Sequence, residues 1–131
     1  MKRIVFLTFS LFLIFSNNLL AAEKPFKLGI VIYSNDTETV WNAFRLADFS
    51  LSKGDEVKIF LLGKGVEYEN LSNKNFDITQ QAQSFLSHKG QIFACGSCLK
   101  IRQKKGDEFC PVSTLANLYE IIRQSDKVLT F

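Results

Sequence analysis

Short apolar segments alternate with amphipathic ones along most of this chain, and this alternation constrains the fold more than any other feature. A short, nearly continuous apolar run is typical of a parallel strand buried on both faces. We expect such strands within residues 26–34, 56–62, 91–95, 109–112 and 127–131. Amphipathic segments between them predict helices up to about residue 52, over 78–88, over 97–103 and from about 114 onward. The order βαβαβαβαβ predicts one α/β domain, a parallel sheet between layers of helices.

Helix starts and chain breaks can be placed from polar residues and glycines. The expected N-caps are Asn35 (with Glu38 in a capping box), Asp77 (with Gln80), and Ser113 or Thr114. Gly54 is expected just past the first helix, and Gly90 is expected to close the second. Gly63-Lys64-Gly65 ends the second strand, and we expect residues 66–76 to form a polar loop.

The first 22 residues have the pattern of a secretory signal peptide. Lys2 and Arg3 precede an almost wholly apolar run from Ile4 to Phe15, and Ala22 lies at the expected cleavage point. The run is short for a membrane span, which takes about 20 residues, although an uncleaved anchor is the alternative. We therefore expect a signal peptide over 1–22 and a mature domain over 23–131. The expected location is the periplasm or outside the cell, where disulfides are permitted.

Charge excludes one class of function. The formal charge of +3 includes Lys2 and Arg3, and without them 14 basic residues face 13 acidic ones. A nucleic-acid binder normally carries a clustered basic excess, so we expect no nucleic-acid partner. Once the signal peptide is removed, we also expect no stable membrane insertion.

The cysteines carry the clearest chemical signal. Cys95 and Cys98 form a CxxC motif at the predicted junction of a strand and a helix, and Cys110 follows. In parallel α/β folds, sites lie beyond the carboxyl ends of the strands, which is where this motif falls. A helix N-terminus favours thiolate over thiol, and Lys100 and Arg102 add positive charge nearby. Because thiolates attack sulfur, we predict sulfur or redox chemistry here.

Structural interpretations of the same cysteines stay open. A Cys95–Cys98 or Cys98–Cys110 disulfide would contribute about 2–3 kcal/mol on the chain-entropy estimate, and inert buried thiols are a further alternative. The three cysteines and His88 make four candidate zinc ligands, but Cys110 and His88 lack the close spacing of a second ligand pair. We expect neither a metal nor another cofactor. Without an early CxxC after the first strand, a thioredoxin fold is also disfavoured.

The most characteristic stretches are Ala94–Arg102 (ACGSCLKIR) and Ser125–Phe131 (SDKVLTF), accompanied by Asn35–Arg45 and Glu56–Gly65. With them, the chain over nearly all of residues 23–131 resembles the DsrE family. The resemblance implies a DsrE/DsrF-like three-layer α/β/α sandwich with a five-stranded parallel sheet, assembled into trimers or hexamers. It also implies sulfur relay, in which one cysteine after the third strand carries a persulfide. That cysteine most resembles Cys98, and Cys95 is then an additional thiol.

Two functions are therefore considered. The first is a periplasmic sulfur-handling protein in which Cys98 carries a persulfide or exchanges disulfides with Cys95 or Cys110, while Lys100 and Arg102 stabilise the anion. Its partner would be a donor or acceptor protein, or a small sulfur compound. The second is a non-catalytic oligomeric binding or scaffold module with a structural disulfide. Nine Phe residues within 23–131 are many for one small domain to bury, which favours a homo-oligomer in either case.

Overall fold

The computed structural model describes residues 24–131, so the predicted signal peptide lies outside the described residues. Five parallel strands form one sheet in the order β4-β3-β2-β1-β5. The strands are β1 (Lys27–Ile32), β2 (Glu56–Leu61), β3 (Gln91–Cys95), β4 (Val112–Ser113) and β5 (Lys127–Thr130). The predicted α/β sandwich with a five-stranded parallel sheet is confirmed.

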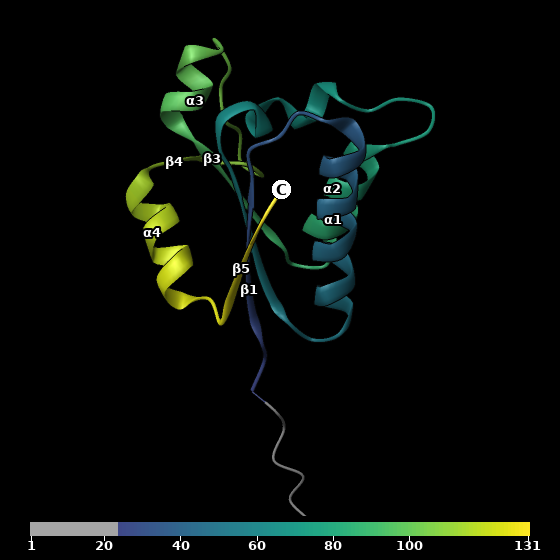
Figure 1. The fold of residues 1–131 in the computed structure, drawn as a ribbon, viewed down its shortest axis with the longest axis vertical. Helices are drawn as coiled ribbons and strands as arrows, with labels where there is room; N and C mark the ends of the chain where they lie inside the picture. The colour runs from purple at the N-terminus through teal and green to yellow at the C-terminus, as the bar shows by residue number, and fades with distance from the viewer. Residues whose placement is uncertain (1–23) are drawn as a thin grey trace, which may run out of the picture.

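Helices cover both faces of the sheet. They are α1 (Thr37–Ser52), the 3₁₀ helix η1 (Gly63–Asn70), α2 (Ile78–Ser87), α3 (Gly96–Ile101) and α4 (Leu115–Gln124). Figure 1 shows α1 and α2 side by side on one face and α4 on the other, with α3 beyond the end of β3. The carboxyl ends of β2 and β3 therefore point toward η1 and α3.

Side-chain alternation along the strands divides the apolar interior into two unequal parts. The larger cluster lies under α1 and α2 and includes Phe44, Phe85 and Ile92. The smaller one lies under α4 and is built from Phe60, Cys95 and Ile121. Because successive residues of a strand point to opposite faces, Ala94 joins the larger cluster and Cys95 the smaller.

Three local expectations were wrong. The N-cap of α1 is Asp36, not Asn35: its carboxylate accepts the Thr39 N–H over 2.8 Å. The segment after β2 begins with a 3₁₀ helix instead of a loop, since Gly63 (φ 56°) turns the chain directly into it. The strand expected at 109–112 is only Val112–Ser113, because the N–H groups of Phe109 and Cys110 donate to Asp107 Oδ1 and Pro111 has none. Asp77 and Thr114 cap α2 and α4 as expected.

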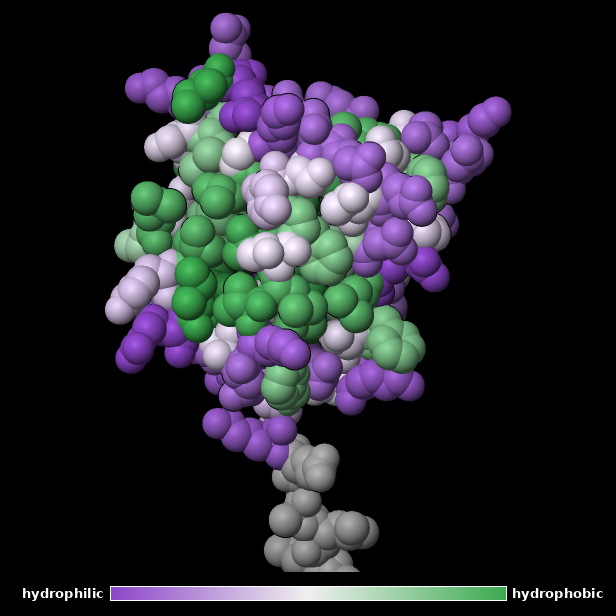
Figure 2. Space-filling model, in the orientation of Figure 1, coloured by the Kyte–Doolittle hydropathy of each residue, from purple (hydrophilic) through white to green (hydrophobic). Residues whose placement is uncertain are grey.

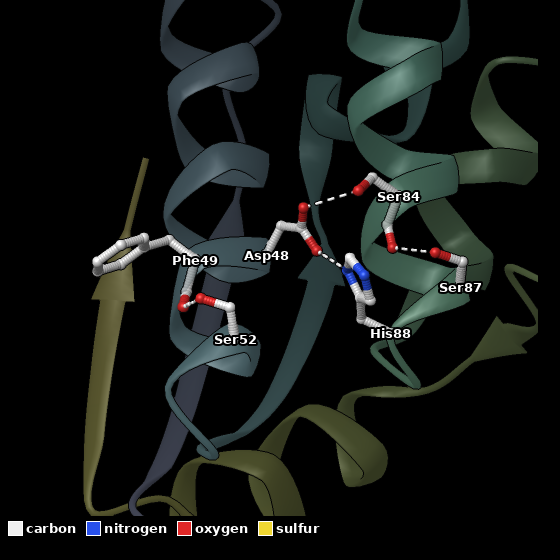
Figure 3. A network of polar contacts seen from close by, with 6 residues as sticks. All are labelled: Asp48, Phe49, Ser52, Ser84, Ser87 and His88. Atoms are coloured by element: carbon white, nitrogen blue, oxygen red, sulfur yellow. Dashed lines mark hydrogen bonds and ion pairs between the residues drawn. The ribbon is translucent and has the colours of Figure 1, made fainter.

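Hydrogen bonds join α1 to α2 on the face of the sheet that these two helices cover. Asp48 Oδ2 accepts the Ser84 hydroxyl over 2.7 Å, and Asp48 Oδ1 lies 2.6 Å from His88 Nδ1 (Figure 3). His88 therefore has a structural contact at the end of α2. Within residues 24–131, no helix is long and apolar enough to cross a membrane.

Candidate functional site

The CxxC motif lies where β3 passes into α3. Cys95 is the last residue of β3 and the N-cap of α3, and its Sγ accepts the Cys98 N–H over 3.3 Å. Cys95 is buried, whereas Cys98 is partly exposed and packs against both apolar clusters. The strand end and the first turn of α3 thus hold the two thiols together at the carboxyl edge of the sheet.

The sulfur of Cys98 points to the neighbouring strand end. Its Sγ accepts the backbone N–H of Gly63, the first residue of η1, over 3.2 Å. Gly63 has a positive φ of 56°, a backbone conformation that residues with a side chain adopt only at a cost in free energy. Glycine therefore suits the turn that presents this N–H. In the sequence, Gly63 was interpreted only as the end of the second strand. The pair of glycines after β2 was the signal that could have indicated a turn presenting a backbone donor here.

Opposing influences set the pKa of Cys98. Desolvation and the Cys95 side chain raise it above the ordinary value, while the Gly63 N–H and the Arg102 guanidinium lower it. The balance is a raised pKa, contrary to the expectation that the helix start would favour the thiolate. The physical reason is desolvation: the Cys98 side chain packs against both apolar clusters and lies beside Cys95, and these effects outweigh the Gly63 N–H and Arg102.

The two predicted basic residues have different surroundings. Arg102 Nη1 donates to the Cys98 carbonyl over 3.3 Å, and Arg102 Nε lies 3.5 Å from Glu67 Oε2 on η1. Lys100 is exposed and lines an open surface trough of about 430 Å³ with Lys104 and Lys105. Arg102, rather than Lys100, is the cation that acts on the Cys98 thiol. Glu67, which the sequence left among solvated carboxylates, holds the Arg102 side chain.

Cys110 occupies different surroundings from the CxxC pair. It is buried in the larger cluster and lines a cavity of about 160 Å³ with Tyr68 and Leu99. Burial, together with the carboxylates of Asp107 and Glu69, raises the pKa of Cys110 to about 12. All three cysteines are free thiols. Among residues 24–131, no cluster of three or more His, Cys, Asp or Glu side chains is arranged to hold a metal ion.

The model of the DsrE/DsrF-like family matches residues 27–131, which include the whole sheet and every residue of the candidate site. The chain belongs to the DsrE/DsrF-like family. A protein of Methanopyrus kandleri described as uncharacterized is 29% identical over 101 residues, covering 72% of this chain and 83% of the relative. An uncharacterized protein of Methanocaldococcus jannaschii is 32% identical over 101 residues, covering 72% of this chain and 88% of the relative.

Solved structures share the same architecture. The YchN protein of E. coli superposes with a TM-score of 0.71 at 22% identity, covering 81% of this chain and 99% of that one. A conserved protein of unknown function from Bacteroides thetaiotaomicron has a TM-score of 0.65 at 21% identity, with coverages of 80% and 94%. These similarities concern the fold, and membership of the DsrE/DsrF-like family connects the protein with sulfur relay.

Proposed function

We propose that this DsrE/DsrF-like protein handles sulfane sulfur and that Cys98 is the acceptor. The observation that carries the proposal is the hydrogen bond from the Gly63 N–H to Cys98 Sγ, 3.2 Å long, at the carboxyl edge of the sheet. A backbone donor aimed at a partly exposed sulfur stabilises negative charge there, as a thiolate or a terminal persulfide requires. Arg102 donates to the Cys98 carbonyl and thereby places its positive charge beside the same residue.

The raised pKa of Cys98 is compatible with this role. A thiol of higher pKa is present less often as thiolate, but the thiolate is then the stronger nucleophile. We expect sulfur transfer to Cys98 to accelerate as the pH rises, because more of the thiol is ionised.

The test is intact-mass analysis of the reduced protein after brief exposure to inorganic polysulfide. Addition of one sulfur atom, about 32 Da, is expected in the Cys110→Ser variant and is not expected in Cys98→Ser. Cys110→Ser is the matched control because Cys110 is a buried thiol in other surroundings. A single sulfur adduct that persists in Cys98→Ser would assign the acceptor role to another cysteine.

The expected location of this activity is the periplasm or the extracellular space, after removal of residues 1–22. The basic start and apolar run of that segment support the proposal. Cell fractionation followed by intact mass should recover a chain beginning near Glu23. Full-length protein confined to the cytosol would contradict it.

We further propose that the protein works as a homo-oligomer, a trimer or hexamer. The apolar side of α4 supports this, since Leu115, Tyr119 and Ile122 are 70%, 60% and 46% exposed. Figure 2 shows apolar side chains gathered over α4 and the strands beside it. Light scattering should give a multiple of the monomer mass, and Tyr119→Glu should reduce it, whereas Glu120→Gln should not. A monomeric wild type would contradict the proposal.

The same exposed surface favours a second candidate function, a non-catalytic oligomeric scaffold. In that case the cysteines pair structurally. Its signature would be a disulfide that resists mild reductant and whose loss lowers the melting temperature, whereas a readily reduced one favours sulfur chemistry.

A further inference from the structure

The surroundings of the cysteines indicate which thiol would remove a persulfide from Cys98. Cys95 and Cys98 are joined by the hydrogen bond from the Cys98 N–H to Cys95 Sγ, 3.3 Å long. Cys95 belongs to the smaller apolar cluster under α4, and Cys98 packs against both clusters. The Cys95 side chain is also one of the groups that raise the pKa of Cys98.

Cys110 does not share this arrangement. Ala94 and Cys95 point to opposite faces of β3, and Cys110 belongs with Ala94 in the larger cluster. Its backbone is fixed by Asp107, whose Oδ1 accepts the Cys110 N–H over 2.8 Å and whose N–H donates to the Cys110 carbonyl over 3.2 Å. The groups that act on the Cys110 thiol are Asp107 and Glu69, not the CxxC cysteines.

We propose that Cys95 is the resolving residue for a persulfide on Cys98 and that the product is hydrosulfide. This inference rests on the proposed acceptor role of Cys98. The Cys95 sulfur attacks Cys98 Sγ, a Cys95–Cys98 disulfide forms, and the bond from Cys98 Sγ to the outer sulfur breaks. The outer sulfur leaves as HS⁻ with the proton that Cys95 gives up, so the sulfane sulfur is reduced by two electrons as the two cysteines are oxidised. A dithiol reductant then restores both thiols.

The position of Cys95 as N-cap provides a conservative variant. Serine is among the preferred N-cap residues, so the hydroxyl of Cys95→Ser is able to accept the same Cys98 N–H without supplying a sulfur nucleophile. Cys110→Ser is the matched control, because it removes a thiol from the opposite face of the sheet. Far-UV circular dichroism and melting temperature verify that each variant is folded.

The experiment follows one turnover. Reduced protein is pulsed with inorganic polysulfide, desalted, and followed by intact mass under denaturing acid and by sulfide assay. Wild type and Cys110→Ser should lose the adduct of about 32 Da, become about 2 Da lighter than the reduced chain, and release close to one equivalent of sulfide. Cys95→Ser should retain the adduct at least about tenfold longer and form no lighter species.

The outcomes separate the two proposals. If Cys95→Ser carries the adduct on Cys98 but loses it as fast as wild type, Cys95 is not the resolving residue, although Cys98 remains the acceptor. A lighter species that depends on Cys110 instead of Cys95 would also overturn the resolving role. If no variant gains sulfur and wild type shows no lighter species, the acceptor role of Cys98 is itself wrong, and the role of Cys95 falls with it.

Discussion

The Gly63 N–H donates to Cys98 Sγ over 3.2 Å and thereby joins the start of η1, just after β2, to the first turn of α3. The two residues are 35 positions apart in the sequence and meet because β2 and β3 are parallel neighbours. Their contact gives the CxxC motif a backbone donor that neither α3 nor the motif itself supplies.

Replacing Gly63 with alanine should therefore slow the reaction of Cys98. A side chain at a φ of 56° costs about 1–2 kcal/mol, and relaxing that strain moves the N–H away from the sulfur. We expect a higher pKa for Cys98 and slower alkylation by iodoacetamide at pH 8, followed by mass spectrometry. Gly54→Ala is the control, because Gly54 also has a positive φ (92°), has open space around it and lies at the end of α1. Equal slowing in both variants would exclude a specific role for the Gly63 N–H.

Removing the charge of Arg102 should also raise the pKa of Cys98, because the guanidinium lowers it in the native protein. In Arg102→Gln the pH profile of Cys98 alkylation should shift to higher pH, so the rate at neutral pH falls. Lys100→Gln should leave the profile unchanged, since Lys100 lies in the exposed trough. A larger shift in Lys100→Gln than in Arg102→Gln would reverse this assignment.

The stability of the protein should fall in alkaline solution because of Cys110. Its pKa is raised from 9.0 to about 12 in the folded protein, so the folded state retains the thiol proton more tightly than the unfolded state. The stabilisation is complete below the unfolded pKa and is lost as the pH rises from about 9 toward 12, by up to about 1.4 kcal/mol per unit. Urea denaturation at pH 7.5 and pH 10 should show a smaller loss in Cys110→Ala than in wild type. Part of the loss should remain, because burial also raises the pKa of Tyr68. An undiminished loss in the variant would contradict the prediction.

Asp48 should matter more to stability than its exposed neighbour His88. The Asp48 carboxylate accepts the Ser84 hydroxyl and contacts His88 Nδ1, so Asp48→Ala leaves one side chain on α2 and one at its C-cap without their partner (Figure 3). We expect a loss of about 1–2 kcal/mol in the free energy of unfolding, measured by urea denaturation. His88→Ala removes only one contact, from a side chain that is 57% exposed, and should cost about half as much. A greater loss for His88→Ala would mean that the contact with Ser84 contributes little.

Much of the fold could be predicted from the sequence because its signals are local. Apolar runs predicted the strands β1, β2, β3 and β5, and Asp77 and Thr114 predicted two helix starts. Where the prediction was wrong, another local interaction competes: Asp36 caps α1 in place of Asn35, and Asp107 holds back the amides that would have extended β4.

The candidate site could be predicted only in part from such local sequence signals. The amino-acid sequence was enough to predict that Cys95 and Cys98 lie where a parallel strand passes into a helix, because strand periodicity and the CxxC spacing are both short-range patterns. Three features depend on the three-dimensional fold: Gly63 donates to Cys98, Glu67 holds Arg102, and Cys110 is buried in the larger apolar cluster. Strand order and the face to which each side chain points bring these groups together or keep them apart. That order comes from packing across the whole sheet rather than from the spacing of residues along the chain.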